Sequence, residues 1–559
     1  MSGTKKMKEQ LDNEEMSISS SEEANEQTVQ NVNEDTGNTN GMLLKIETTN
    51  IDPESRPMCF TSTFQEYVCV LALAFAPAAA SMASSAFQVS LTELSSHFDI
   101  VGGKLTWSVS SVTLANGSSL LLMGGLADAF GRRNTLLFGY FSYTLAALIG
   151  GFMKDYVALC IFRALQGMFV AASVPSAAGF LGATYKNGRR KNMVMSVFAA
   201  GAPVGGSLGL VLGAVFAQIF NWRAVHFYLA IFYGALAVLV FFVMPSDKKV
   251  NWTEAMKILK GLDYLGSFIS LSGVTLICFS LTQADSLETG WHTGYIIALL
   301  VVGIFLMGCF VVYESYVPER PVMPMQMWKS KSFCLAMGVA MFSYMEFFGV
   351  LNYYAALYFE QIRNYSPIIT GVCFLTQPIA GTLVNVFAGF TMHLIPGTIL
   401  VIVGTAGLTA AAIIWATLSI HRNYFLGPFW SFILTVLGVD LVYNVVNRVA
   451  LSSVDKTLQS RAAGTFNTVM QLSATIGLSI SATIVSAKNP YYGTPEQNTH
   501  IVELFESFKY AYYFAIGCGA TSLIFSCLIR VGVVGNVAPK PDKEEVVEAD
   551  SEPKPQLNS

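Results

Sequence analysis

Three ionisable side chains fall inside long apolar stretches of the sequence, where such residues are rare. Arg163, Glu346 and Asp440 interrupt runs of roughly 20 mostly apolar residues, a length that spans a bilayer as a helix. An ionised side chain in hydrocarbon costs at least about 2.5 kcal/mol, so each should face a cavity or a partner. A buried carboxyl group can take up and release a proton, whereas arginine keeps its proton. The pattern predicts proton binding at Glu346 and Asp440, with Arg163 holding a charge or tuning a nearby carboxylate.

Each of these residues also has a structural interpretation. Arg163 would then bond to backbone carbonyls, and a neutral Glu346 or Asp440 would bond to a neighbouring helix. None of the six histidines falls in the middle of an apolar run, so a histidine relay is not expected. Other polar residues within the runs could line a cavity or act as hydrogen bonds between helices. These cavity candidates are Gln88, Asn116 and Gln166 in the first half, and Asn352, Tyr353, Gln377, Asn385, Asn444 and Asn447 in the second.

A charged segment, GGLADAFGRR at residues 124–133, separates two of the apolar runs. Arginines at such a position resist passage through the membrane, and glycines let two helix ends approach closely. That topological role leaves the acid and the glycine spacing unexplained. The residues concerned are Gly124, Asp128, Gly131, Arg132 and Arg133.

Glycines recur in GAPVGGSLG at residues 201–209, which contains no acid or base. Glycine removes side-chain bulk and proline bends a helix, so this segment is expected to kink and to pack closely on a neighbour. It is interpreted as a conformational element, whose close packing sets how tightly one side of the helix bundle seals against leak. Ordinary packing of small residues is the alternative. Its residues are Gly201, Pro203, Gly205, Gly206 and Gly209.

The composition shows what must hold these residues in place. Of the 559 residues, 53% are hydrophobic and 13% are charged, whereas soluble domains carry about 25% charged residues. Short alternating segments typical of membrane β-barrels are not seen. The fold class is therefore an all-α polytopic membrane protein, the lipid bilayer being its first partner. Fourteen transmembrane helices are predicted at 64–89, 107–127, 135–153, 157–181, 192–218, 224–244, 263–283, 294–316, 333–357, 367–391, 396–420, 425–449, 461–487 and 508–534.

An even number of helices places both termini on one side. With the termini inside, sixteen Lys and Arg fall in inner loops and seven in outer loops, so both termini are predicted to be cytoplasmic. The polar ends of the chain are predicted to be disordered. The resulting organisation is a tail at 1–63, a six-helix bundle at 64–244, a linker with two extra helices at 245–332, a second bundle at 333–534 and a tail at 535–559.

Several function classes are disfavoured. The nine cysteines are scattered without metal-ligand spacing, and no catalytic triad or phosphate-binding loop is evident. No enzyme activity, metal, organic cofactor or nucleic-acid partner is expected. The energy source would be a proton gradient.

Three motifs, in order, resemble those of the major facilitator superfamily. Residues 124–133 resemble its signature loop between the second and third helices, and RALQG at 163–167 resembles its intramembrane arginine motif. Residues 201–209 resemble the antiporter signature of proton-coupled exporters, with Ala202 where the pattern usually has glycine. Fourteen spans resemble the fungal-type drug:proton antiporters, and GRRKNMVMSVF at 188–198 and GVDL at 438–441 resemble their aminotriazole-resistance-like branch, which includes boron exporters and ammonium facilitators.

The resemblance implies two six-helix bundles with two additional central helices, moving around a shared site. It also implies that residues 124–133 act as a gating loop, in which Asp128 faces the other half and stabilises the outward-open form. We expect proton-coupled export of a small molecule such as a drug, a xenobiotic or boron. The alternatives are a facilitator or uptake carrier, for a solute such as ammonium, and a membrane sensor that transports nothing. A monomer in the plasma membrane is favoured over one in the vacuolar membrane.

Overall fold

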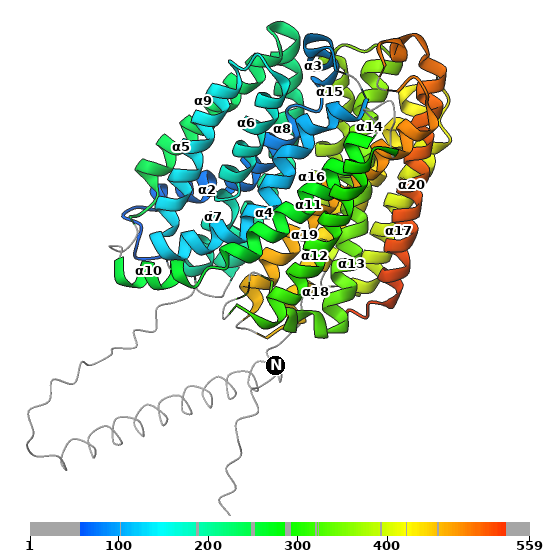
Figure 1. The fold of residues 1–559 in the computed structure, drawn as a ribbon. Coiled ribbons are helices and arrows are strands. Elements are labelled where there is room, and N and C mark those ends of the chain that lie inside the picture. Colours follow the sequence, from blue (N-terminus) through cyan, green and yellow to red (C-terminus); the bar gives the residue numbers. More distant parts are fainter. Residues whose placement is uncertain are drawn as a thin grey trace, which may run out of the picture. The chain divides into compact units, whose positions relative to one another are not determined.

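The computed structural model describes residues 56–532 apart from short gaps at 101, 186–188, 247–251, 285–291, 319–320, 322, 392–393, 421, 456–457 and 493. These residues belong to one compact unit, and the elements they form are all helical (Figure 1). The predicted tails lie outside the described residues, except for 56–63. The all-α fold class predicted from composition is confirmed.

The N-terminal half contains the helices of the first predicted bundle. Helix starts are fixed by capping side chains: the Ser62 hydroxyl accepts from the Gln65 amide, and the Asp155 and Asn221 side chains accept from Ala158 and Ala224. The elements are α2 (Thr63–Ser85), α3 (Leu91–Phe98), η1 (Gly102–Thr106), α4 (Trp107–Phe130), α5 (Arg132–Gly150), α6 (Tyr156–Val170), α7 (Ser173–Thr184), α8 (Arg189–Ile219) and α9 (Trp222–Val243).

The second half follows two intervening helices that pack on each other, α11 and α12. A short amphipathic helix, α10, precedes them and was not predicted. The elements are α10 (Trp252–Lys260), α11 (Tyr264–Ala284), α12 (Gly294–Tyr316), η3 (Met325–Lys329), α13 (Lys331–Glu346), η4 (Phe347–Leu351), α14 (Asn352–Leu357), η5 (Tyr358–Ile362), α15 (Pro367–Phe374), α16 (Thr376–Thr391), α17 (Gly397–Ala416), η6 (Tyr424–Leu426), α18 (Pro428–Ser452), α19 (Gln459–Lys488), η8 (Pro495–Thr499) and α20 (Ile501–Leu528).

Twelve helices in the described chain are long and apolar enough to cross a membrane, and a bent pair raises the number to 13. The bent pair is Lys104–Leu120 with Leu122–Phe130, which turns by 51° within the second predicted span. The remaining predicted span coincides with α5, a 19-residue helix that is not among these 13 because it carries Arg132, Arg133 and Asn134 in its first turn. The predicted number of fourteen is consistent with the structure and stays a prediction.

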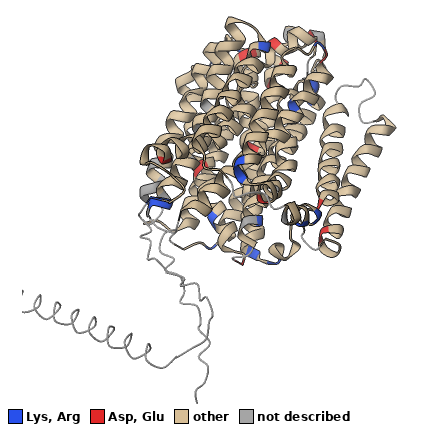
Figure 2. Cartoon of the chain, turned by 90° about the vertical axis from the view of Figure 1, so that its left-hand side faces the viewer, with Lys and Arg blue, Asp and Glu red and all other residues tan. Residues whose placement is uncertain are grey.

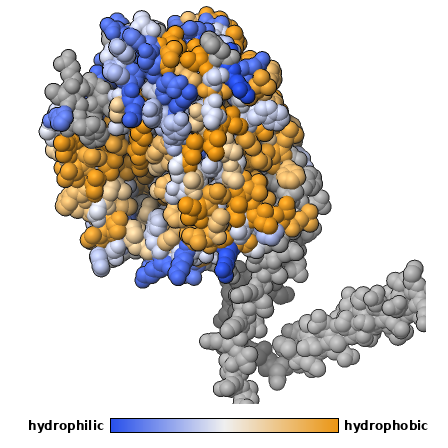
Figure 3. All heavy atoms as spheres, turned by 90° about the vertical axis from the view of Figure 1, so that its right-hand side faces the viewer, coloured by the Kyte–Doolittle hydropathy of each residue, from blue (hydrophilic) through white to orange (hydrophobic). Residues whose placement is uncertain are grey.

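Charged residues gather toward the two ends of the helical body, and most of the ribbon between them is uncharged (Figure 2). The side of the body seen in Figure 3 carries a broad hydrophobic zone between more hydrophilic ends. This distribution suits a protein whose sides face lipid and whose ends face water.

The first span of the C-terminal half is irregular. It runs from Lys331 to Ile362 as 32 residues and includes two π-helical turns, η4 and η5. Such turns are rare and often occur at functional sites. Glu346 directly precedes the first turn, and Glu360 lies within the second.

Glycines allow α8 to pack closely against α2. A side chain at Gly205 would overlap the backbone of Ala78, and one at Gly201 would overlap the backbone of Ala74. A side chain at Gly209 would overlap the Ser85 hydroxyl and approach the backbone of Met82, both on α2. The spacing of four residues places these glycines on one face, so the segment packs two backbones together. Pro203 lies within α8, which runs as one continuous helix from Arg189 to Ile219.

We predict that Gly205→Ala destabilises the protein and that Gly206→Ala does not. A Cβ at position 206 would meet the nearest atom, Ser81 Cβ, at 3.9 Å, an ordinary contact. Overpacking at position 205 should cost about 1–3 kcal/mol. Melting curves of the purified variants in one detergent test this, and equal melting temperatures for the two variants would contradict the packing account.

Candidate transport site

The two halves are packed tightly together at one end of the body, which we name the α3 end. There one apolar cluster combines residues of both halves, including Leu91, Leu94 and Leu210 from the first and Tyr354 and Leu357 from the second. Polar contacts also cross the interface, since the Ile368 amide donates to Gln218 at 2.9 Å. The α3 end is closed.

At the opposite end, which we name the α10 end, the halves face each other across a cavity of about 470 Å³. Its walls come from α4, α5 and α7 of the first half and from the first turns of α19 in the second. The segment between α10 and α11 also contributes. Charged lining residues are Asp128, Arg132, Asp263 and Arg461.

The predicted gating loop forms the sharp corner between α4 and α5. Gly131 has φ 95°, a conformation that favours glycine, and this explains the glycine at that point of the motif. The Asp128 side chain is 65% exposed in the cavity, and its Oδ1 lies 3.8 Å from Arg132 Nη2. Arg133 binds the Phe241 carbonyl and the Ser246 hydroxyl instead. Gly124 lies near Pro175, where a Cβ would fit at 3.7 Å.

Arg163 is completely buried inside the N-terminal half. Its Nε donates to the Ser108 carbonyl at 2.9 Å, and Nη1 donates to the Ala83 carbonyl at 3.2 Å and to Gln166 Oε1 at 3.4 Å. The guanidinium also lies 4.0 Å from the centre of the Phe87 ring. No ion pair found in the described residues involves Arg163. These contacts match the structural interpretation, in which Arg163 ties α6 to α2 and α4.

Asp440 lies in an acid–amide cluster between α16 and α18. Asn385 Nδ2 donates to Asp440 Oδ2 at 2.8 Å, and Asn444 Nδ2 donates to Asn385 Oδ1 at 3.0 Å. Asn444 also donates to the Asp440 carbonyl at 2.9 Å. The structure thus brings together three residues that the sequence identified separately. Asn447 is one turn further along α18, where its Oδ1 is a buried atom without a hydrogen bond among the described residues.

Glu346 lies apart from that cluster. Its carboxyl group is fully buried, close to Gly519 of α20 and Thr409 of α17. Neither carboxyl oxygen has a hydrogen bond within the described part of the chain. Glu346 is therefore inside the C-terminal half, where a neutral carboxyl group is the less costly form.

The other cavity candidates are dispersed. Gln377 Nε2 donates to Asn352 Oδ1 at 2.7 Å, joining α16 to α14. Tyr353, which follows Asn352 in the sequence, is buried. Gln88 and Asn116 are buried in the N-terminal half. None of these residues is in the lining of the cavity at the α10 end.

Sequence reasoning missed three buried polar sites. Glu66 on α2 accepts from the Tyr185 hydroxyl at 2.8 Å and forms an ion pair with Arg190. His226 Nδ1 lies 3.2 Å from Gln166 Nε2, and Glu360 accepts from Thr92. In the sequence, each site is marked only by an ionisable residue near the end of an apolar run. Such a residue is a weak signal, because at a helix end its side chain can equally well reach water.

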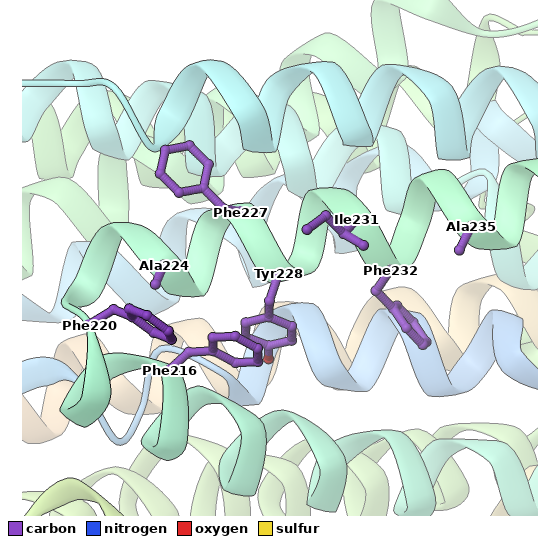
Figure 4. A pocket seen from close by; sticks show the side chains of 8 residues that line it. All are labelled: Phe216, Phe220, Ala224, Phe227, Tyr228, Ile231, Phe232 and Ala235. Atoms are coloured by element: carbon purple, nitrogen blue, oxygen red, sulfur yellow. The ribbon is translucent and has the colours of Figure 1, made fainter.

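A second hollow lies along α8 and α9 (Figure 4). It measures about 510 Å³ and is lined by aromatic and aliphatic side chains, with Phe216 stacked on Tyr228 at 4.8 Å between ring centres. Ile231 is 73% exposed in it. An open, apolar groove on a membrane helix suits acyl chains, so it is a poor counterpart for a polar solute.

Comparisons with known proteins agree with this architecture. The family model described as Major Facilitator Superfamily matches residues 73–478. The low affinity ammonium transporter of Saccharomyces cerevisiae is 33% identical over 69% of this chain and 75% of its own length. The aminotriazole resistance protein of the same yeast is 25% identical, covering 85% of this chain and 86% of its own. The Major facilitator superfamily multidrug transporter mdr3 of Aspergillus fumigatus is 28% identical over 68% of this chain and 65% of its own length.

Solved structures share the fold at low sequence identity. A peptide transporter POT in complex with sulfate superposes with a TM-score of 0.56 and 16% identity, over 83% of this chain and 96% of the other. A bacterial homolog of the human lysosomal transporter Spinster gives 0.53 and 13% identity, over 84% and 97%. The paired halves, the motif loop and the family match lead to one conclusion. The chain belongs to the major facilitator superfamily as a multi-pass membrane transporter of the fungal drug-transporter type, and is not an enzyme.

Proposed function

We propose that this transporter exports small molecules in exchange for protons, by alternating access of a site between its halves. The observation that carries the proposal is the Asp440–Asn385–Asn444 cluster, which supplies one titratable group with neutral amide partners. Glu346 is a second, weaker proton-binding candidate, and Arg163 supports the fold around the site. No cofactor is needed, because the proton gradient supplies the energy.

The closed α3 end and the cavity at the α10 end support an assignment of this structure to one state of the cycle. If the termini are cytoplasmic, as the loop charges predict, the cavity faces the cytoplasm. Asp128 then lies opposite the first turns of α19, where Arg461 is located. Closure of the α10 end would bring Asp128 toward Arg461 and the positive end of α19, stabilising the outward-open form.

The substrate is proposed to be a small cation or weak base. The acid–amide cluster offers a carboxylate and amide oxygens, and no Lys or Arg takes part in its hydrogen bonds among the described residues. Relatives named for ammonium transport, multidrug transport and aminotriazole resistance are consistent with this class. Borate, which is not cationic, would instead require the amides alone. We also propose that the protein acts as a monomer in the plasma membrane.

Transport into sealed inside-out vesicles tests the proposal. Vesicles from cells that produce the protein, with an acid interior, should accumulate ammonium, an azole, borate or a cationic dye. A protonophore should abolish the accumulation of whichever solute is carried. Saturable uptake that persists unchanged with the protonophore would overturn proton coupling and establish the second candidate, a facilitator, which the ammonium-transporter relative favours. If deletion of residues 1–57 instead removes a cellular response and no probe moves, the protein is a sensor.

A further inference from the structure

Glu360 joins the two halves at the closed α3 end. Its Oε2 accepts hydrogen bonds from the amide of Thr92 at 3.2 Å and from the hydroxyl of Thr92 at 2.6 Å. Thr92 belongs to α3 of the first half, and Glu360 belongs to η5 of the second. Glu360 is only 4% exposed, so its carboxyl group has left water to make this contact.

A second carboxyl group, that of Glu93, lies beside the same contact. Glu93 Oε1 accepts from the Trp222 amide at 2.9 Å, at the start of α9. Glu93 directly follows Thr92, the residue that Glu360 binds, so negative charges on the two carboxyl groups would repel each other. Glu93 Oε2 and Glu360 Oε1 are both buried without a hydrogen bond among the described residues.

The cations around this pair are directed elsewhere. Arg363 donates to the Ile420 carbonyl at 2.9 Å and to the Tyr365 hydroxyl at 3.0 Å. Arg223 lies over the Trp222 ring at 4.6 Å and contacts His97 at 3.3 Å. Neither glutamate takes part in the ion pairs found within the described residues.

Within the described residues, no other titratable group is hydrogen-bonded to the side chain of Glu93 or Glu360. Tyr353 lies in the same span as Glu360, and the Tyr156 hydroxyl donates to the Lys104 carbonyl at 2.7 Å. Gln497 of η8 contacts the neighbouring Gln361 at 3.4 Å. Burial raises the pKa of the Glu93 carboxyl above its usual range, against the opposing effect of the Trp222 amide. Two ionised carboxylates at this interface would oppose its closure.

We infer that Glu360, together with Glu93, forms a proton-binding gate that closes the α3 end only when the pair holds a proton. A single shared proton would leave Thr92 and Trp222 as donors to the remaining oxygens. Opening exposes both groups to water, where they ionise and repel. The inference rests on the proposed alternating-access function and adds a proton site that is separate from Asp440.

The sign of the pH effect follows from this arrangement. Low pH on the α3 side protonates the pair and favours closure, whereas high pH ionises both groups and favours opening. If closure takes up one proton, the ratio of closed to open molecules changes by up to about tenfold per pH unit. Glu360→Gln mimics the protonated group permanently, so it should keep the end closed at high pH.

Distances between spin labels test the gate in full-length protein in nanodiscs. Labels at Ser96 and Ile369, two exposed positions on α3 and α15, report the separation of the halves. The exposed Cys59 and Cys527 are first replaced by serine. From about pH 5 to about pH 9, a range that covers shifted carboxyl groups, the wild type should change from short to long distances. Glu360→Gln should stay short.

The matched control is Glu503→Gln, a half-exposed acid at the start of α20, which should behave like the wild type. A wild type that shows no pH dependence, or a Glu360→Gln variant that keeps the wild-type dependence, would overturn the gate. This outcome is distinct from failure of the proposed function. Vesicle transport without proton coupling would refute the exporter while leaving the label distances as predicted.

Discussion

Replacing Asp440 with asparagine is expected to abolish accumulation driven by a pH gradient, while substrate-for-substrate exchange continues. The substituted side chain keeps an oxygen that can accept from Asn385, so the cluster should stay folded. An amide does not bind and release a proton near neutral pH, so net transport of the substrate loses its energy source. The measurement is uptake into acid-loaded vesicles, compared with exchange of labelled for unlabelled solute at equal pH on both sides.

Asp455→Asn is the matched control for that experiment. Asp455 lies in an exposed position after α18, so the same change of charge should leave both assays unaffected. Loss of both activities in Asp440→Asn, with normal amounts of protein, would show that Asp440 binds substrate or stabilises the fold. Retention of both would contradict its role in proton coupling. Glu346→Gln tests the weaker proton-binding candidate in the same assays.

Most of the architecture follows from physical regularities that a single sequence displays. A helix that crosses a membrane needs a long apolar run, so the spans were visible in the composition. The reason for the glycine at position 131 was not visible in the sequence, because only the folded chain shows its φ of 95°. The shorter elements were not visible either: α3 and α10 have eight and nine residues, which is too short for an apolar run to mark.

The contacts of the predicted site residues could not be read from the sequence. Asp440, Asn385 and Asn444 meet because their helices α16 and α18 pack together, a contact that no local pattern encodes. Arg163 looked like a partner for a charge, but its Nε and Nη1 donate to backbone carbonyls and to Gln166. Only the folded chain reveals which carbonyl groups point at a buried guanidinium.

The interfacial acids were the hardest to identify from sequence. Glu360 lies 268 positions from Thr92, and each looks like an ordinary helix-end residue. Their significance depends on closure of the α3 end, which is a property of one conformation of the whole molecule. The same holds for Asp128, whose exposure in the cavity reflects separation of the halves at the α10 end.

A disulfide across the closed α3 end is predicted to stop transport completely and reversibly. The Cβ of a residue placed at Gly371 would lie 3.0 Å from Ala214 Cβ, close to the spacing that disulfides adopt after a small adjustment. Ala214 lies on α8 in the first half and Gly371 on α15 in the second. Ala214→Cys with Gly371→Cys should therefore lock this end shut once oxidised.

The control pair joins helices that should move together. Ser81→Cys with Gly206→Cys links α2 to α8 within the first half, where the Cβ separation would be 3.9 Å. Oxidation of this pair should leave transport unchanged, since both helices belong to one rigid half.

Vesicle transport by the two cross-linked variants, before and after reduction, tests directly whether the halves must separate at the α3 end in every cycle. The account predicts that oxidised Ala214→Cys/Gly371→Cys transports no more than vesicles lacking the protein, and that a reductant restores activity. Full transport by the oxidised protein, with the disulfide verified by mass spectrometry, would contradict alternating access between the two halves.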